Sequence, residues 1–242
     1  MQFRVLTYNV HKGIGGIDRR YRPERIMTVV EHYAPDIVLL QEVDDGVPRS
    51  HFHCQVDLFA DALGFDHRAY QKNVSLKVGC YGNAILSRYP IDILGSIDLT
   101  LPYKKRRQAL VASVHLRWEH HTRTLVLTNV HLGLSGYERK QQLLRLLDHE
   151  FLRHHHRQTP MIIGGDYNDV WGKLGNHSLV PAGFTCATGR IRTFPAALPL
   201  RPLDRFFVRG NLNVDHVFAG HSNLARQASD HLPLIGDFVL IE

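Results

Sequence analysis

Polar side chains that could do chemistry recur where apolar, strand-like segments of the sequence end or begin. They are Asn9, Glu42, His131, Asp166, Asn168, Asp230 and His231. Taken singly, each has an ordinary structural explanation, because Asn and Asp are common in turns and a histidine can be buried in a core. Turns do not readily explain the same placement in several segments, since the ends of strands in an open sheet are where side chains converge on a ligand. We therefore predict that these residues share one site.

Carboxylates that share a cleft need a positive partner. The acidic residues expected in this site are Glu42, Asp166, Asp204 and Asp230. Two carboxylates about 4 Å apart repel by roughly 4 kcal/mol at an effective dielectric of about 20, so such a cluster binds a cation or takes up protons. Oxygen ligands without a Cys/His set favour Mg²⁺ or Mn²⁺ over Zn²⁺. Such a cation suits a phosphate ester because it neutralises charge on phosphoryl oxygens. The residues thus predict a metal-dependent phosphoesterase.

The sequence lacks the motifs of other common enzyme classes. It has no P-loop, no Rossmann glycine pattern, and no HExxH or GxSxG motif. The three cysteines are far apart in the chain and odd in number, which fits a reducing cytoplasm. Neither an apolar run of about 18 residues nor a signal-peptide pattern is found. We expect a cytoplasmic monomer without a transmembrane segment.

The composition is that of a globular protein with a basic balance. Apolar residues make up 44% of the 242 residues and charged residues 21%, and no linker or repeat divides the chain, so we expect one catalytic domain over residues 1–242. The formal charge is +6 and the pI is near 9.3. This balance favours polyanionic partners such as nucleic acids or anionic lipid surfaces. It is equally compatible with a modest excess of positive charge that has no functional role.

Hydrophobic periodicity predicts alternating strands and helices early in the chain and strand pairs later. Helical spacing is found over residues 23–33, with the stripe Ile26, Val29, Val30 and Tyr33, over 56–63, and over 136–156, with Tyr137, Leu144, Leu147 and Phe151 on one face. Strands are expected over 2–9, 36–42, 83–91, 109–116, 124–132, 160–166, 203–208, 214–218 and 233–241, with a hairpin across 117–123. The pattern predicts an α/β sandwich with mixed sheets and leaves the strand order open.

The same residues carry a family resemblance. The segments LTYNVH (6–11), LLQEV (39–43), GNAILSRYPI (82–91), NVHLG (129–133), GGDYND (164–169), LDRFFV (203–208) and SDHLPL (229–234) resemble, in order, the motifs of the endonuclease/exonuclease/phosphatase superfamily. That superfamily includes apurinic endonucleases, pancreatic-type deoxyribonuclease, sphingomyelinases and inositol polyphosphate 5-phosphatases. Within it, the HKG after YNV and the stretch RTFPAALPLRPLDR look like small bacterial proteins of the YbhP type.

The resemblance implies a fold and a metal site. The fold would be a four-layer α/β sandwich, two mixed β-sheets flanked by helices, with the site at one sheet edge. Glu42 would be the main ligand of a Mg²⁺ or Mn²⁺ ion, supported by Asn9 and Asp230. Asp166 would orient or deprotonate the attacking water, and Asn168 would hold the phosphate. Whether the site takes one metal or two stays open.

The resemblance also implies roles for the remaining residues. His231, steadied by Asp204, would activate water or stabilise the transition state, so the identity of the general base stays open. His131 would donate to a phosphoryl oxygen or to the leaving group. Arg107 matches the position of a phosphate-contacting arginine in nuclease relatives, although Arg106 is adjacent.

We expect a phosphate-ester substrate of one of two classes, since the intact motifs argue against a third possibility, a catalytically inactive binding module that uses the basic surface. The basic balance favours a phosphodiesterase or nuclease that acts on nucleic-acid or nucleotide-like diesters. The alternative is a hydrolase of phospholipid head groups or small phosphomonoesters that uses the same site. The sequence shows neither an insertion long enough for extra DNA-gripping loops nor the hydrophobic hairpin expected of membrane-attacking sphingomyelinases.

Overall fold

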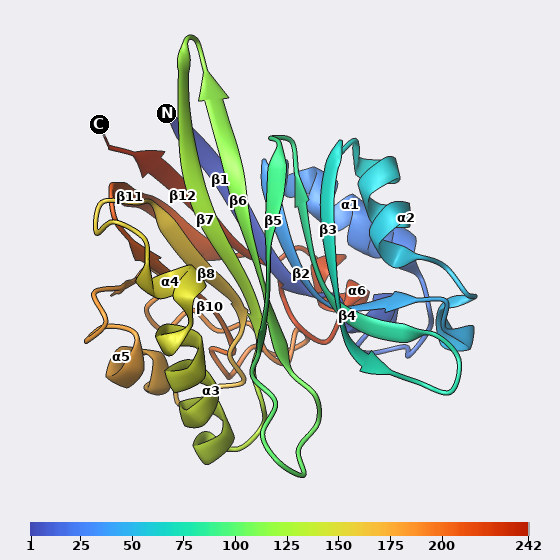
Figure 1. Cartoon of the computed structure of the whole chain (residues 1–242). Coiled ribbons are helices and arrows are strands. Elements are labelled where there is room, and N and C mark those ends of the chain that lie inside the picture. The colour runs from blue at the N-terminus through green and yellow to red at the C-terminus, as the bar shows by residue number, and fades with distance from the viewer. Residues whose placement is uncertain (242) are drawn as a thin grey trace.

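Two six-stranded sheets form the centre of the computed structural model, which describes residues 1–241 (Figure 1). The first sheet has the strand order β11 (Leu212–Ala219), β12 (Leu234–Leu240), β1 (Gln2–Asn9), β2 (Ile37–Asp45), β4 (Cys80–Ser87), β3 (His67–Ser75). The second has the order β5 (Ile91–Asp98), β6 (Gln108–Trp118), β7 (His121–His131), β8 (Met161–Asp166), β10 (Asp204–Arg209), β9 (Thr185–Cys186). Both sheets are mixed, because β1 runs parallel to β2 and β7 parallel to β8 while the other pairs are antiparallel.

Three apolar layers hold the sandwich together. Between the sheets, side chains such as Leu39 and Ile85 pack with Leu127 and Ile162. The first sheet is covered by α1 (Pro23–Tyr33), α2 (Gln55–Leu63) and α6 (Ala225–Ala228). The second is covered by α3 (Gly136–Asp148), α4 (Glu150–Arg153) and α5 (Leu174–Ser178). The order helix, sheet, sheet, helix confirms the predicted four-layer sandwich (Figure 1).

Strand register carries the polar strand ends to one edge of the sandwich. His131 pairs with Asp166 across β7 and β8, and Asp166 pairs with Asp204 across β8 and β10. In the other sheet, Asn9 at the end of β1 pairs with Gln41 of β2. The Asn9 side chain joins the two sheets, since its Nδ2 donates to Asp166 Oδ2 at 3.0 Å.

The two glycines before Asp166 allow this close approach. Gly165 has a φ of +140°, and a Cβ at this position would lie 2.0 Å from the Val130 carbonyl oxygen. A Cβ on Gly164 would lie 2.6 Å from Leu39 Cδ1 of the facing sheet. Because any side chain here would push the strands or sheets apart, the GGD sequence is required for Asp166 to reach the edge.

Most predicted elements are confirmed, but one helix was predicted too long and with the wrong apolar face, and strands β3, β5 and β9 were not predicted. The long helix expected over 136–156 ends at Asp148, and a short second helix follows after His149. Its expected apolar face was also wrong, because Tyr137 and Leu144 are exposed while Leu143 and Leu146 are buried. Strand β3 was not predicted, because its sequence HRAYQKNVS has few apolar residues. Within residues 1–241, no helix is long and apolar enough to cross a membrane.

Candidate active site

A pocket of about 510 Å³ opens at the edge where the polar strand ends meet. Most residues singled out in the sequence line it: Asn9, Glu42, Arg107, His131, Asp166, Asn168, Asp230 and His231. Asp204 is fully buried and is bonded to His231. The fold therefore brings every candidate site residue into one neighbourhood.

His231 is held by a buried aspartate. Its Nδ1 lies 2.8 Å from Asp204 Oδ2, and the Thr193 hydroxyl donates to the same oxygen. Burial alone would lower the pKa of His231, but the charges of Asp204 and Asp166 outweigh burial and raise it to about 10. His231 is therefore an imidazolium at neutral pH. Asp204 Oδ1 has no hydrogen-bond partner among the described residues. The positive charge of His231 is therefore the main compensation for the buried negative charge of Asp204.

Asp166 lies beside this pair. Its Oδ2 accepts from Asn9 and lies 3.4 Å from His131 Nε2 and 3.7 Å from His231 Nε2. Its Oδ1 accepts the backbone N–H of Asn168 at 2.8 Å. Burial raises the pKa of Asp166 to about 6, although the His231 charge opposes the rise. At neutral pH Asp166 is thus an ionised carboxylate with a higher proton affinity than an exposed aspartate.

Glu42 carries its own counter-charge. The ammonium group of Lys12 contacts Glu42 Oε2, and both side chains are largely buried. Burial would raise the pKa of Glu42, but the charges of His131, when it is protonated, and of Lys12 lower it. Burial and the nearby Arg107 charge hold the pKa of His131 well below its ordinary value. Since His131 is therefore neutral at pH 7, Lys12 is the cation that keeps Glu42 ionised.

Several pocket residues have a left-handed backbone, which is uncommon outside glycine. The φ angles are +45° at His11, +62° at Lys12, +59° at Glu42 and +49° at Asn168. Such a conformation costs about 1 kcal/mol or more per residue, and it persists only where surrounding contacts impose it. The contacts of these residues in the pocket hold the backbone in this conformation.

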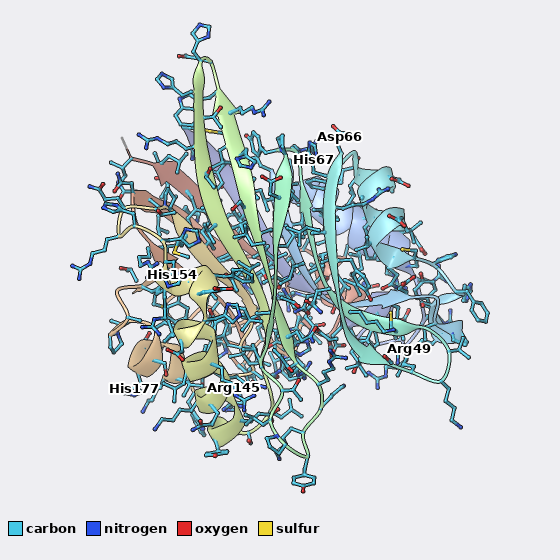
Figure 2. All side chains as sticks on the ribbon, viewed as in Figure 1. Arg49, Asp66, His67, Arg145, His154 and His177 are labelled. Atoms are coloured by element: carbon cyan, nitrogen blue, oxygen red, sulfur yellow. The ribbon has the colours of Figure 1, made fainter. Side chains whose placement is uncertain are left out.

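Further cations line the same pocket. Arg107 is buried, whereas the adjacent Arg106 is exposed, so the structure places Arg107 and not Arg106 at the pocket. Lys105 also lines the pocket, and its ammonium lies 5.0 Å from the centre of the Tyr81 ring. The Lys12 ammonium lies 5.9 Å from the centre of the same ring, and the Arg49 guanidinium carbon lies 5.4 Å from it. Arg49 is labelled in Figure 2. The pocket is therefore suited to an anionic ligand.

Sequence analysis missed several residues of this site. Lys12 and Thr193 were not identified, although Lys12 lies only three positions after Asn9 and thus belongs to the same loop. The contact of Thr193 with Asp204 joins residues from different segments and has no local signal. Phe194 also lines the pocket, as expected from the sequence because its segment leads directly into Asp204. The remaining lining residues are His11, Lys105, Leu134, Val170, Arg201 and Leu203.

The donor set fits a hard divalent cation. Glu42 and Asp230 supply carboxylate oxygens, and the amide oxygen of Asn9 accepts the N–H of His11 with a lone pair to spare. Asp166, Asp204 and His231 form another group whose ligand atoms lie within 4.8 Å of one another. There two carboxylates face one imidazolium, that of His231, whereas Glu42 is paired with Lys12. Both groups supply oxygen atoms of the kind that a hard cation binds.

Comparisons with known proteins concern the family and the fold. A family model described as Endonuclease/Exonuclease/phosphatase family matches residues 6–231. The uncharacterized protein YbhP of Escherichia coli strain K12 is 34% identical over 251 residues, covering 98% of this chain and 96% of that protein. The crystal structure of an endonuclease/exonuclease/phosphatase from Beutenbergia cavernae has a TM-score of 0.82 at 23% identity, covering 99% of this chain and 72% of that one. A mannosyl-6-phosphatase from Bacteroides thetaiotaomicron has a TM-score of 0.74 at 16% identity, covering 98% and 100%.

Proposed function

Because the chain belongs to the endonuclease/exonuclease/phosphatase family, we propose that it is a divalent-metal-dependent phosphodiesterase. The observation that carries this proposal is the buried pair of His231 and Asp204, which lies beside Asp166 in a pocket that also holds Glu42. Members of this family hydrolyse phosphate esters, and a pocket with an imidazolium, a basic carboxylate and several cations supports the same reaction here.

We assign the proton-accepting role to Asp166. With a pKa of about 6 it is ionised at neutral pH and can take a proton from an attacking water, whereas His231, with a pKa of about 10, holds its own proton and cannot. The water oxygen forms the new bond to phosphorus, and the bond to the leaving oxygen breaks. His231 donates a hydrogen bond to a phosphoryl oxygen and stabilises its growing charge. The neutral His131 donates a hydrogen bond to the leaving oxygen, which departs as an anion and takes its proton from solvent water.

The other pocket residues hold the phosphate and the cation. Glu42, with Asn9 and Asp230, would hold Mg²⁺ or Mn²⁺, which when bound neutralises charge on phosphoryl oxygens. Arg107 and Asn168 orient the phosphate from the same pocket.

A diester fits this pocket better than a monoester. Leu134, Val170 and Phe194 line the pocket together with the charged groups and provide apolar contact for a second ester group. The net charge of +6 supports a substrate that belongs to a polyanion, either a nucleic-acid strand or a phospholipid in an anionic surface.

The test is hydrolysis of bis(p-nitrophenyl) phosphate and a matched monoester with Mg²⁺, with Mn²⁺ and after chelation, beside single- and double-stranded DNA, RNA and phospholipids. We expect diester hydrolysis that requires the metal and is lost in Glu42→Gln. Glu31→Gln, on the exposed face of α1, is the matched control and keeps full activity. Full diester turnover after exhaustive chelation, or in Glu42→Gln, contradicts the proposal.

A further inference from the structure

Large apolar side chains that face solvent lie in the loops that also supply lining residues of the pocket. Among the described residues, the most exposed of them include Leu134 at 77%, Trp171 at 71% and Leu198 at 66%. The full set at this edge is Tyr103, Leu134, Tyr137, Trp171, Leu198 and Leu200, which we call the rim. Single exposed apolar residues are ordinary on a protein surface, but a group around one pocket mouth marks an interaction site.

The rim belongs to the loops that build the pocket. Four segments carry it: 99–107, 132–140, 167–174 and 189–203. Each segment also supplies a pocket-lining residue, namely Lys105, Leu134, Val170 and, for the last, Phe194 and Arg201. In Figure 1 the connection from β5 to β6 and the first turn of α3 extend to the same edge of the molecule. Arg145 of α3, labelled in Figure 2, ties them together by donating to the Thr100 carbonyl.

The exposed charged side chains of the four loop segments that carry the rim are all positive. The cations in these segments include Lys104, Lys105, Arg106, Lys140, Lys173 and Arg201. The acidic residues of the same four segments, Glu138 and Asp169, are both buried, so no exposed carboxylate occurs in this part of the described chain. Apolar tips between exposed cations are typical of a surface that inserts into the interface of an anionic membrane.

A nucleic-acid strand fits fewer of the rim residues than a lipid surface does. Bases stack on aromatic side chains, so Tyr103 and Tyr137 would suit a strand. Trp171 already has the Arg201 guanidinium 5.4 Å from its ring centre. Leu134, Leu198 and Leu200 offer no stacking face, whereas insertion into acyl chains uses leucine and aromatic residues alike.

We propose that the rim seats the pocket mouth on an anionic phospholipid surface, so that the substrate is a phospholipid whose phosphodiester enters the pocket from the membrane. This inference rests on the proposed function for the reaction, but binding to the surface is a separate property of the rim. Because the apolar residues come from four loops, the surface forms without an apolar hairpin in the sequence.

The test is sedimentation of the full chain with vesicles of phosphatidylglycerol and phosphatidylcholine, and with vesicles of phosphatidylcholine alone. We expect binding to the anionic vesicles that falls about tenfold or more in the triple variant Tyr103→Ser, Trp171→Ser, Leu198→Ser. The matched control, Ile93→Ser with Leu144→Ser, removes exposed apolar residues from β5 and the middle of α3 and keeps full binding. The chain has two tryptophans, so Trp118→Phe leaves Trp171 as the only reporter, and its emission is expected to shift to shorter wavelength on the vesicles.

The outcomes separate this inference from the proposed function. Hydrolysis of bis(p-nitrophenyl) phosphate is measured in parallel and is expected to persist in the triple variant. Loss of vesicle binding with that hydrolysis retained supports the rim. Absence of vesicle binding by the unaltered chain, equal binding by the triple variant, or selective binding of an oligonucleotide overturns it. Vesicle binding without any diester hydrolysis supports membrane binding by the rim and contradicts the proposed phosphodiesterase activity instead.

Discussion

The ammonium group of Lys12 contacts the carboxylate of Glu42 inside the pocket, and both residues have a left-handed backbone. Glu42 is the residue that we assign as the principal cation ligand, so the fold places an internal cation where an external one would bind. The pair reduces the repulsion expected from clustered carboxylates, since Lys12 pairs with Glu42, and the imidazolium of His231 lies beside Asp166 and Asp204. If Glu42 is that ligand, Lys12 would compete with a divalent cation for it.

Lys12→Met is expected to bind Mn²⁺ up to about tenfold more tightly, because the competing ammonium is gone, as measured by isothermal titration calorimetry. The same variant is expected to lose about 3 kcal/mol or less of metal-free unfolding free energy, since Glu42 is left without its partner. Lys140→Met, at an exposed position of α3, is the control for both measurements. Weaker Mn²⁺ binding by Lys12→Met would show that Lys12 assists the cation rather than competing with it.

Asp204→Asn is expected to lower kcat for the generic diester by about 100-fold with little change in KM, because the charge that holds His231 as an imidazolium matters most in the transition state. The pKa of His231, followed by NMR titration, is expected to fall from about 10, since Asp204 is the largest source of its rise. Asp92→Asn is the matched control, because the exposed Asp92 pairs with the half-buried His115 at 2.6 Å, away from the pocket. A change confined to KM would assign Asp204 to substrate binding.

The rate is expected to depend on pH through two groups. Asp166 must be ionised to accept a proton, so kcat/KM should fall as the pH drops through about 6. His231 must be protonated to donate, so kcat/KM should fall as the pH rises through about 10. The measurement is a pH profile with a saturating cation at each pH. If the acidic limb survives in Asp166→Asn at the residual rate, another group controls it.

Arg107→Gln is expected to raise KM for the diester about tenfold, because it removes a charged hydrogen-bond donor from the pocket. Arg106→Gln is the neighbouring control and should leave KM for the soluble diester unchanged, since Arg106 is exposed. Steady-state kinetics of both variants provide the comparison. An equal or larger effect at Arg106 would reverse the assignment of the phosphate-contacting arginine.

Local patterns determined much of this protein in advance. The helix at Pro23–Tyr33, the buried strands and the polar residues at their ends follow from periodicities of two and 3.6 residues, which depend only on near neighbours in the chain. The same patterns were misleading for α3, where Tyr137 and Leu144 are exposed, because an apolar stripe does not show which neighbour covers it.

Tertiary structure alone decided the rest. The strand order depends on pairing between segments far apart in the chain, such as β1 with β12, and no local period encodes that choice. The contacts of Lys12 with Glu42 and of Thr193 with Asp204 depend on that pairing. The rim was also invisible in the sequence, because each loop contributes one or two apolar residues and only the closed sandwich brings them around one mouth. Chemistry was readable from residue types at strand ends, whereas charge balance and surface shape arise from long-range packing.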